Sequence, residues 1–335
     1  MCHADLVARD GDFPLPLPGV VGHEGERVAG CRSARTARRT TSHRYFIPAG
    51  KRNLVMASKI AYGSLPSQFG VLHLPAGSGP FPVVVMVHGG WWAAMWDDTA
   101  VQPLISDLVG EGYAVWSVEY RRMGEAGAGW PGTFSDIAAA VDFVGSLDAP
   151  LDLSRVAVVG HSAGGHLATW TAHRGALPAG VVGAEPSVAL VGVVSVAGVL
   201  DLVAADGARL GTELADLSRE PPRGAPGPSG PDFWPLVAAG VGEGMTRFFV
   251  GTSAVADPGL YALVSPAEMG DAGVPVLAVH GSADEVIPQE FSRTYAARHA
   301  LGEFVDSPGG DHFSVIEPDS HAWSVARKWL ADKLS

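Results

Sequence analysis

Short, continuous apolar runs recur along most of the chain. They are rich in β-branched residues and show little alternation with polar ones. Such runs are typical of strands that are covered on both faces, as in the middle of a parallel sheet. They predict five central strands: Val83 to His88, Ala114 to Val118, Arg155 to Gly160, Val191 to Val196 and Val276 to His280.

Helical patterns fall between these strands. Ile137, Val141 and Val144 recur at helical spacing, and Thr133 with Asp136 three residues on resembles a helix start. A second helix is predicted over Leu104 to Val109, with Gly110 as its stop. Strands and helices therefore alternate as in β-α-β units, which predicts an α/β fold with a mostly parallel central sheet and helices on both faces.

Two segments interrupt this alternation. Prolines and glycines crowd residues 219–235, where regular structure is not expected. We interpret about 204–244 as a Pro/Gly-rich lid insertion. No periodicity survives before about residue 50. The sequence thus predicts an irregular extension over 1–50, without function of its own, and one large domain over 51–335.

Composition narrows the class of protein. With 335 residues, of which 47% are hydrophobic and 17% charged, the chain can bury one large core. The net charge of -12 disfavours nucleic-acid binding. The longest apolar run, Val188 to Leu200, is short for a membrane span, and the first 30 residues do not resemble a secretory signal. We expect a cytoplasmic protein that acts on a small-molecule substrate, without a nucleic-acid or membrane partner; a homodimer is compatible with the sequence.

The pentapeptide Gly160-His-Ser-Ala-Gly164 carries the strongest chemical signal, because it follows directly on a predicted strand. A strand that enters Gly-x-Ser-x-Gly and continues as a helix forces the serine onto a tight, strained turn with its hydroxyl exposed. Ser162 is therefore the predicted nucleophile.

A serine nucleophile needs a base and a carboxylate that orients the base. His312, in the loop Gly309-Gly-Asp-His-Phe near the end of the chain, is the predicted base. Asp284, one turn beyond a predicted strand, is the predicted acid; Glu285 and Asp311 are its rivals, and a turn-capping role is the alternative for Asp284. Four other histidines fit surface or helix positions without a chemical role: His73, His173, His299 and His321.

The oxyanion would be held by backbone amides. The amide after the nucleophile, at Ala163, is one donor, and the loop that begins at His88 supplies Gly89, Gly90 and Trp91. We interpret His88 as a hydrogen bonder that fixes this loop rather than a second base. Trp91 and Trp92 fit a substrate-binding aromatic wall and a core position equally well.

Three motifs, Met86-Val-His-Gly-Gly-Trp-Trp, Gly160-His-Ser-Ala-Gly-Gly-His-Leu and Asp311-His-Phe-Ser-Val-Ile-Glu, together resemble α/β hydrolases of the kynurenine formamidase (arylformamidase) type, which are related to hormone-sensitive-lipase-like esterases. The resemblance runs from about Ala61 to the end. It implies an α/β hydrolase fold, the triad Ser162, Asp284 and His312, and no cofactor. By this resemblance the reaction would be hydrolysis of an aryl formamide such as N-formylkynurenine.

The amino terminus resembles a different family. Cys2 and the pair His23-Glu24 look like the catalytic-zinc region of medium-chain zinc alcohol dehydrogenases, over about 30 residues. The sequence has only one other cysteine, Cys31, and lacks a separate dinucleotide fingerprint, so we interpret the segment as a joined fragment and expect no metal site.

The sequence thus favours a serine hydrolase that cleaves a small aryl formamide or an ester through an acyl-enzyme. A general carboxylesterase on short-chain esters is the alternative within this class. A non-catalytic binding protein that keeps the fold and a zinc oxidoreductase are the alternatives outside it.

Overall fold

A mostly parallel sheet forms the centre of the protein. The computed structural model describes residues 56–212, 214 and 240–335, and within these the sheet has the order β1-β2-β4-β3-β5-β6-β7-β8. Strands β1 and β2 are antiparallel to their neighbours, and the others are parallel. The strands are β1 (Met56–Ala61), β2 (Phe69–Leu74), β3 (Phe81–Val87), β4 (Ala114–Val118), β5 (Leu151–His161), β6 (Gly192–Val196), β7 (Val276–Gly281) and β8 (Gly302–Ser307).

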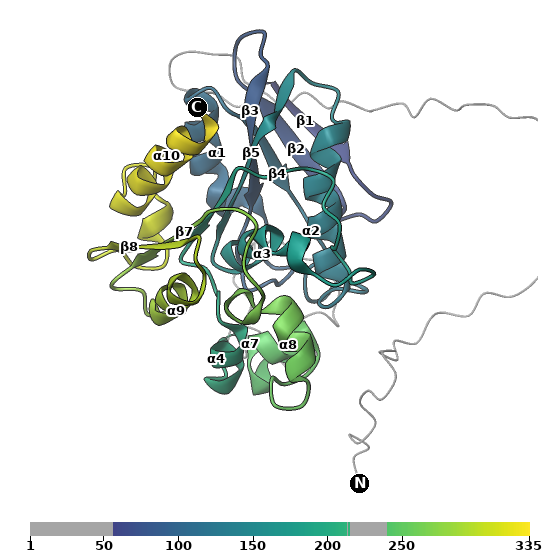
Figure 1. Ribbon diagram of the computed structural model, residues 1–335, viewed down its shortest axis with the longest axis vertical. Coiled ribbons are helices and arrows are strands. Elements are labelled where there is room, and N and C mark those ends of the chain that lie inside the picture. The colour runs from purple at the N-terminus through teal and green to yellow at the C-terminus, as the bar shows by residue number, and fades with distance from the viewer. Residues whose placement is uncertain (1–55, 213, 215–239) are drawn as a thin grey trace, which may run out of the picture. The chain divides into compact units, whose positions relative to one another are not determined.

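Helices cover both faces of the sheet (Figure 1). One face carries α1 (Gln102–Gly110) and α10 (His321–Leu334), and the other carries α2 (Gly132–Asp142), α3 (Ala163–Ala172) and α9 (Glu290–Arg298). Shorter helices pack together after β6: α4 (Leu202–Gly207), α7 (Met245–Val250) and α8 (Pro258–Val264). The described helices include none long and apolar enough to cross a bilayer. The predicted α/β architecture is confirmed.

The central strands are apolar throughout because both of their faces are buried. In β3, Val83, Val85 and Val87 pack against α2 and α3, whereas Val84 and Met86 pack against α1 and α10. All five side chains are inaccessible to solvent. Each contributes about 1.5–3 kcal/mol through burial, which explains why this strand has no polar alternation.

The helix predicted to start near Thr133 is present as α2, but Thr133 and Asp136 do not cap it. The helix begins at Gly132, after Pro131, without a side-chain cap. Thr133 instead donates its hydroxyl to the carbonyl of Arg121 at 2.6 Å, and Asp136 forms an ion pair with the guanidinium of Arg121 at 2.7 Å. Both polar side chains serve tertiary contacts with the segment that follows β4, which their spacing alone could not indicate.

Candidate active site

Ser162 lies on a strained turn between β5 and α3. Its backbone has φ 56° and ψ -121°, a region that non-glycine residues rarely adopt. The turn closes tightly: a Cβ on Gly160 would lie 2.1 Å from the carbonyl oxygen of Gly164, and a Cβ on Gly164 would lie 2.2 Å from that of Val87. The two glycines of the motif are therefore required by packing.

The structure brings the three predicted catalytic side chains together. The Ser162 hydroxyl lies 3.0 Å from Nε2 of His312, and Nδ1 of His312 lies 2.7 Å from Oδ2 of Asp284. Because the carboxylate of Asp284 accepts a hydrogen bond from the N–H at Nδ1, Nε2 carries no proton and can accept one from the serine hydroxyl. The three groups form one continuous series of hydrogen bonds, although Ser162 lies 150 residues from His312 in sequence.

Asp284 both orients His312 and caps its own turn. Its Oδ1 accepts the backbone amides of Val286 at 2.9 Å and Ile287 at 2.8 Å, while Oδ2 accepts from Nε2 of His280 at 3.1 Å as well as from His312. Burial favours the neutral carboxyl, but the hydrogen bonds from His280 and His312 outweigh it and hold the pKa of Asp284 well below its usual range. Asp284 therefore stays ionised.

The rival carboxylates lie elsewhere. Glu285 is exposed to solvent. Asp311 caps its own loop, because its Oδ1 accepts the amides of Phe313 at 2.9 Å and Ser314 at 2.8 Å. Neither has a hydrogen bond to His312 among the described contacts, so Asp284 is the carboxylate that reaches the base.

Two buried histidines that the sequence interpretation did not single out, His161 and His280, support the hydrogen bonds among Ser162, His312 and Asp284. Nε2 of His161 donates to the backbone carbonyl of His312 at 2.9 Å, and the two rings lie 4.8 Å apart. Burial, followed by the charge of His312, lowers the pKa of His161 to about 3, so His161 is a neutral support for the loop. Nε2 of His280 lies between Oδ2 of Asp284 and the carbonyl oxygen of Ile287, at 3.1 and 3.0 Å, and its Nδ1 lies 2.8 Å from Oγ of Ser292.

The predicted oxyanion loop lies directly against the nucleophile. A Cβ on Gly89 would lie 3.1 Å from Cβ of Ser162 and only 2.8 Å from the backbone carbonyl oxygen of His161, so a side chain at this position would force the backbone to shift. The loop then turns through positive φ at Gly90 and Trp91. Among the described residues, the amides of Gly90, Trp91 and Ala163 have no backbone acceptor, which leaves them available to a developing oxyanion.

A pocket of about 290 Å³ opens beside these amides. Trp91 lines it, but Trp92 does not: Trp92 is fully buried, stacks on Phe249 at 4.4 Å and donates to Nδ1 of His166 at 3.2 Å. The substrate-binding prediction for Trp92 is therefore wrong, because its indole belongs to the core. The other lining residues are Gly89, Gly90, Trp96, Asp97, Ala100, His161, Ser162, Leu214, Val286, His312, Phe313 and Ile316.

The surface interpretation of the remaining histidines needs correction. His73, His173 and His299 are buried, and only His321 is exposed. His173 donates to the carbonyl of Gly270 at 2.6 Å, and His299 donates to that of Pro266 at 2.9 Å. These acceptors come from distant segments, so the local pattern does not show that the rings are internal.

Several predictions lie outside the described residues: the extension over 1–50 with Cys2, His23 and Glu24, and most of the insertion over 204–244. The division of the chain into these parts stays a prediction. Among the residues that the structure describes, no cluster of three or more His, Cys, Asp or Glu side chains could hold a metal ion.

Solved esterase structures share this architecture. A truncated form of a carbohydrate esterase from gut microbiota is 21% identical, with 84% of this chain and 96% of that one covered and a TM-score of 0.59. An acetyl ester-xyloside bifunctional hydrolase from Caldicellulosiruptor lactoaceticus is 18% identical, with 82% of this chain and 96% of that one covered and a TM-score of 0.57. A thermophilic esterase from the Planctomycetes species Thermogutta terrifontis with butyrate bound is 20% identical, with 82% of this chain and 94% of that one covered and a TM-score of 0.56.

A family model described as BD-FAE matches residues 71–221, which include the predicted oxyanion loop and nucleophile. No curated protein matches the chain. With the sheet order and the turn at Ser162, these likenesses establish the α/β hydrolase fold. None of the descriptions mentions an aryl formamide or an alcohol dehydrogenase.

Proposed function

We propose that this protein is a serine carboxylesterase that cleaves small, neutral esters through an acyl-enzyme. The observation that carries the proposal is the chain of hydrogen bonds from Ser162 through His312 to Asp284, at 3.0 and 2.7 Å, at the edge of a largely apolar pocket. The esterase descriptions of the structural relatives support the same class.

In this mechanism His312 takes the hydroxyl proton of Ser162 as the oxygen attacks the ester carbonyl. Asp284 stabilises the resulting imidazolium. The amides of Gly90, Trp91 and Ala163 donate to the tetrahedral oxyanion. His312 then protonates the leaving alcohol, and water, activated by the same histidine, releases the acid from the serine.

The shortage of charged partners in the described pocket lining favours a neutral ester over N-formylkynurenine. The lining residues within the described part of the chain include no lysine or arginine, and the one carboxylate, Asp97, is a cap for the amide of Thr99 at 3.0 Å. N-formylkynurenine carries an α-carboxylate and an ammonium group at pH 7. Burying these charges without partners opposes binding, whereas a neutral alkyl or aryl ester needs none.

The proposal is tested by kcat/KM values for p-nitrophenyl butyrate and N-formylkynurenine. We expect a preference for the ester on the order of 100-fold or more, because unpaired charges are costly to bury. Phenyl formate and formanilide, both neutral, form a second pair that separates the effect of charge from that of the leaving atom. Ser162→Ala is the control for background hydrolysis. A preference for N-formylkynurenine would replace the carboxylesterase assignment with the arylformamidase one.

A further inference from the structure

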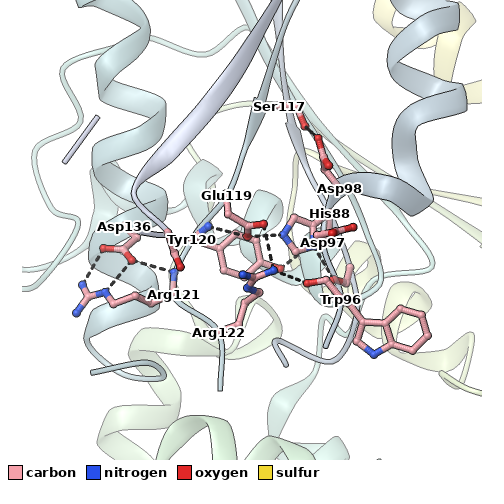
Figure 2. Close-up of polar contacts among 12 residues, drawn as sticks. His88, Trp96, Asp97, Asp98, Ser117, Glu119, Tyr120, Arg121, Arg122 and Asp136 are labelled. Carbon is pink, nitrogen blue, oxygen red and sulfur yellow. Dashed lines mark hydrogen bonds and ion pairs between the residues drawn. The ribbon is translucent and has the colours of Figure 1, made fainter. Parts of the chain in front are cut away.

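His88, at the end of β3, is buried and has acceptors on both ring nitrogens. Nδ1 lies 2.8 Å from the carbonyl oxygen of Gly89, and Nε2 lies 2.8 Å from Oε1 of Glu119 (Figure 2). A carbonyl and a carboxylate can only accept, so each ring nitrogen carries a proton. Burial lowers the pKa of His88, but the charge and hydrogen bond of Glu119 outweigh it, and the net shift is upward. His88 is therefore a cation that donates a hydrogen bond to the carbonyl of the Gly89–Gly90 peptide, at the start of the oxyanion loop.

Glu119, which follows β4, meets donors only. Its Oε1 accepts from His88 and from the amide of Tyr120 at 3.0 Å, and Oε2 lies 3.1 Å from Nη1 of Arg122. Three donors on two oxygens suit a carboxylate. A glutamine of the same shape would turn its NH₂ group toward one of these donors, so the site specifies the charge as well as the volume.

The same segment holds the far end of the loop. The guanidinium of Arg122 donates to the backbone carbonyl of Trp96, and Figure 2 shows Arg122 between this carbonyl and Glu119. Between the two ends, the amide of Met123 donates to the carbonyl of Trp92 at 2.6 Å. Hydrogen bonds thus connect residues 88–96 to residues 119–123 at both ends of the loop and between them.

We propose that Glu119 is a positioning residue for oxyanion stabilisation: through His88 and Arg122 it holds both ends of the loop that presents the Gly90 and Trp91 amides. The proposal rests on the proposed serine hydrolase function. Glu119 does not line the pocket, so its effect on catalysis passes through the loop. The sequence signal is slight, since Glu119 and Arg122 are charged residues directly after a buried strand, where a sheet-edge site forms.

Glu119→Gln tests this role because it removes the charge and leaves the volume. The variant should displace the oxyanion donors without removing them. We therefore expect kcat to fall by about 10- to 100-fold, which is less than the fall of about 10²- to 10³-fold caused by deleting one donor. KM should stay within about 2-fold, since the loop amides act mainly on the transition state. A trifluoromethyl ketone, whose adduct with Ser162 places an oxyanion in the hole, should bind more weakly in proportion to the loss of kcat/KM.

Asp136→Asn is the matched control. Asp136 is also a buried carboxylate that accepts several donors close to β4, from Arg121 and Gln68, but it does not contact residues 88–96. We expect it to lower the thermal midpoint while kcat of the folded enzyme stays within 2-fold. Equal kcat losses in both variants would assign Glu119 to general stability and overturn the positioning role.

An unchanged kcat in Glu119→Gln, or a loss without weaker ketone binding, would also overturn it. If Glu119→Gln fails to fold, Arg122→Lys is the second variant. It keeps the positive charge but removes the guanidinium that donates to the backbone carbonyl of Trp96. A several-fold loss of kcat with parallel weakening of the ketone would support the proposal, and no loss would overturn it. A wild-type protein that neither hydrolyses esters nor binds the ketone would instead refute the proposed function itself.

Discussion

The protonation state of His166, a buried histidine beneath the oxyanion loop, can be tested through the pH dependence of stability. Its ring is fully buried on α3, where Nδ1 accepts from the indole of Trp92 at 3.2 Å and Nε2 donates to the carbonyl of Val264 at 2.8 Å. Protonation would set an N–H at Nδ1 against the indole N–H. Burial, only partly offset by the hydrogen bond to Val264, lowers the pKa of His166 from 6.5 to about 4.

The sign of the pH effect follows from this depressed pKa. Between pH 6.5 and about 4 the unfolded chain binds a proton at this site that the folded chain does not, so stability falls as the pH falls through that window. Between pH 7 and pH 5 the loss amounts to about 2 kcal/mol of unfolding free energy from this one ring.

His166→Gln removes the titration, and its amide can still accept from Trp92 and donate to Val264. Urea unfolding of both proteins at pH 7, 6 and 5 measures the difference. The variant should lose about 2 kcal/mol less than the wild type between pH 7 and pH 5, whatever its stability at pH 7. Parallel losses in the two proteins would refute the inference that His166 is neutral and desolvated in the folded state.

Two further variants test the turn and the acid. Gly164→Ala places a Cβ 2.2 Å from the carbonyl oxygen of Val87, so it should destabilise the fold by about 3 kcal/mol or more in chemical denaturation, and a cost below about 1 kcal/mol would show that the turn can relax. Asp284→Asn should leave the fold intact and lower kcat by roughly 10⁴-fold, because an amide no longer fixes the proton of His312 on Nδ1. A loss below about 10-fold would mean that another group orients the base.

The central sheet could be predicted because its strands are buried on both faces, which leaves an unbroken apolar run in the sequence. The outer strands carry no such signal. β8 is mostly half-buried and polar, as Glu303 and Asp306 show, and β2 includes His73. Such strands are defined by the partner beside them rather than by their own composition.

The candidate site divides in the same way. Ser162 and His312 stand in local motifs whose backbone geometry is dictated by glycines, and Asp284 follows a strand that could be identified. His280 and Glu119 have no such motif, since their partners come together only in the folded chain. Trp92 shows the converse: it adjoins a pocket residue in sequence, but the positive φ values of the loop send the two indoles in different directions, with ring planes 69° apart.

The central claim is that Ser162 is the nucleophile of an acyl-enzyme, and covalent labelling tests it most directly. The protein is treated with a fluorophosphonate, its intact mass is measured, and the adduct is located by peptide mapping. We expect one adduct per chain, on Ser162, with labelling slowed by p-nitrophenyl butyrate and absent in Ser162→Ala, which should also lack turnover. An adduct on another residue, or ester hydrolysis that survives in Ser162→Ala, would contradict the account.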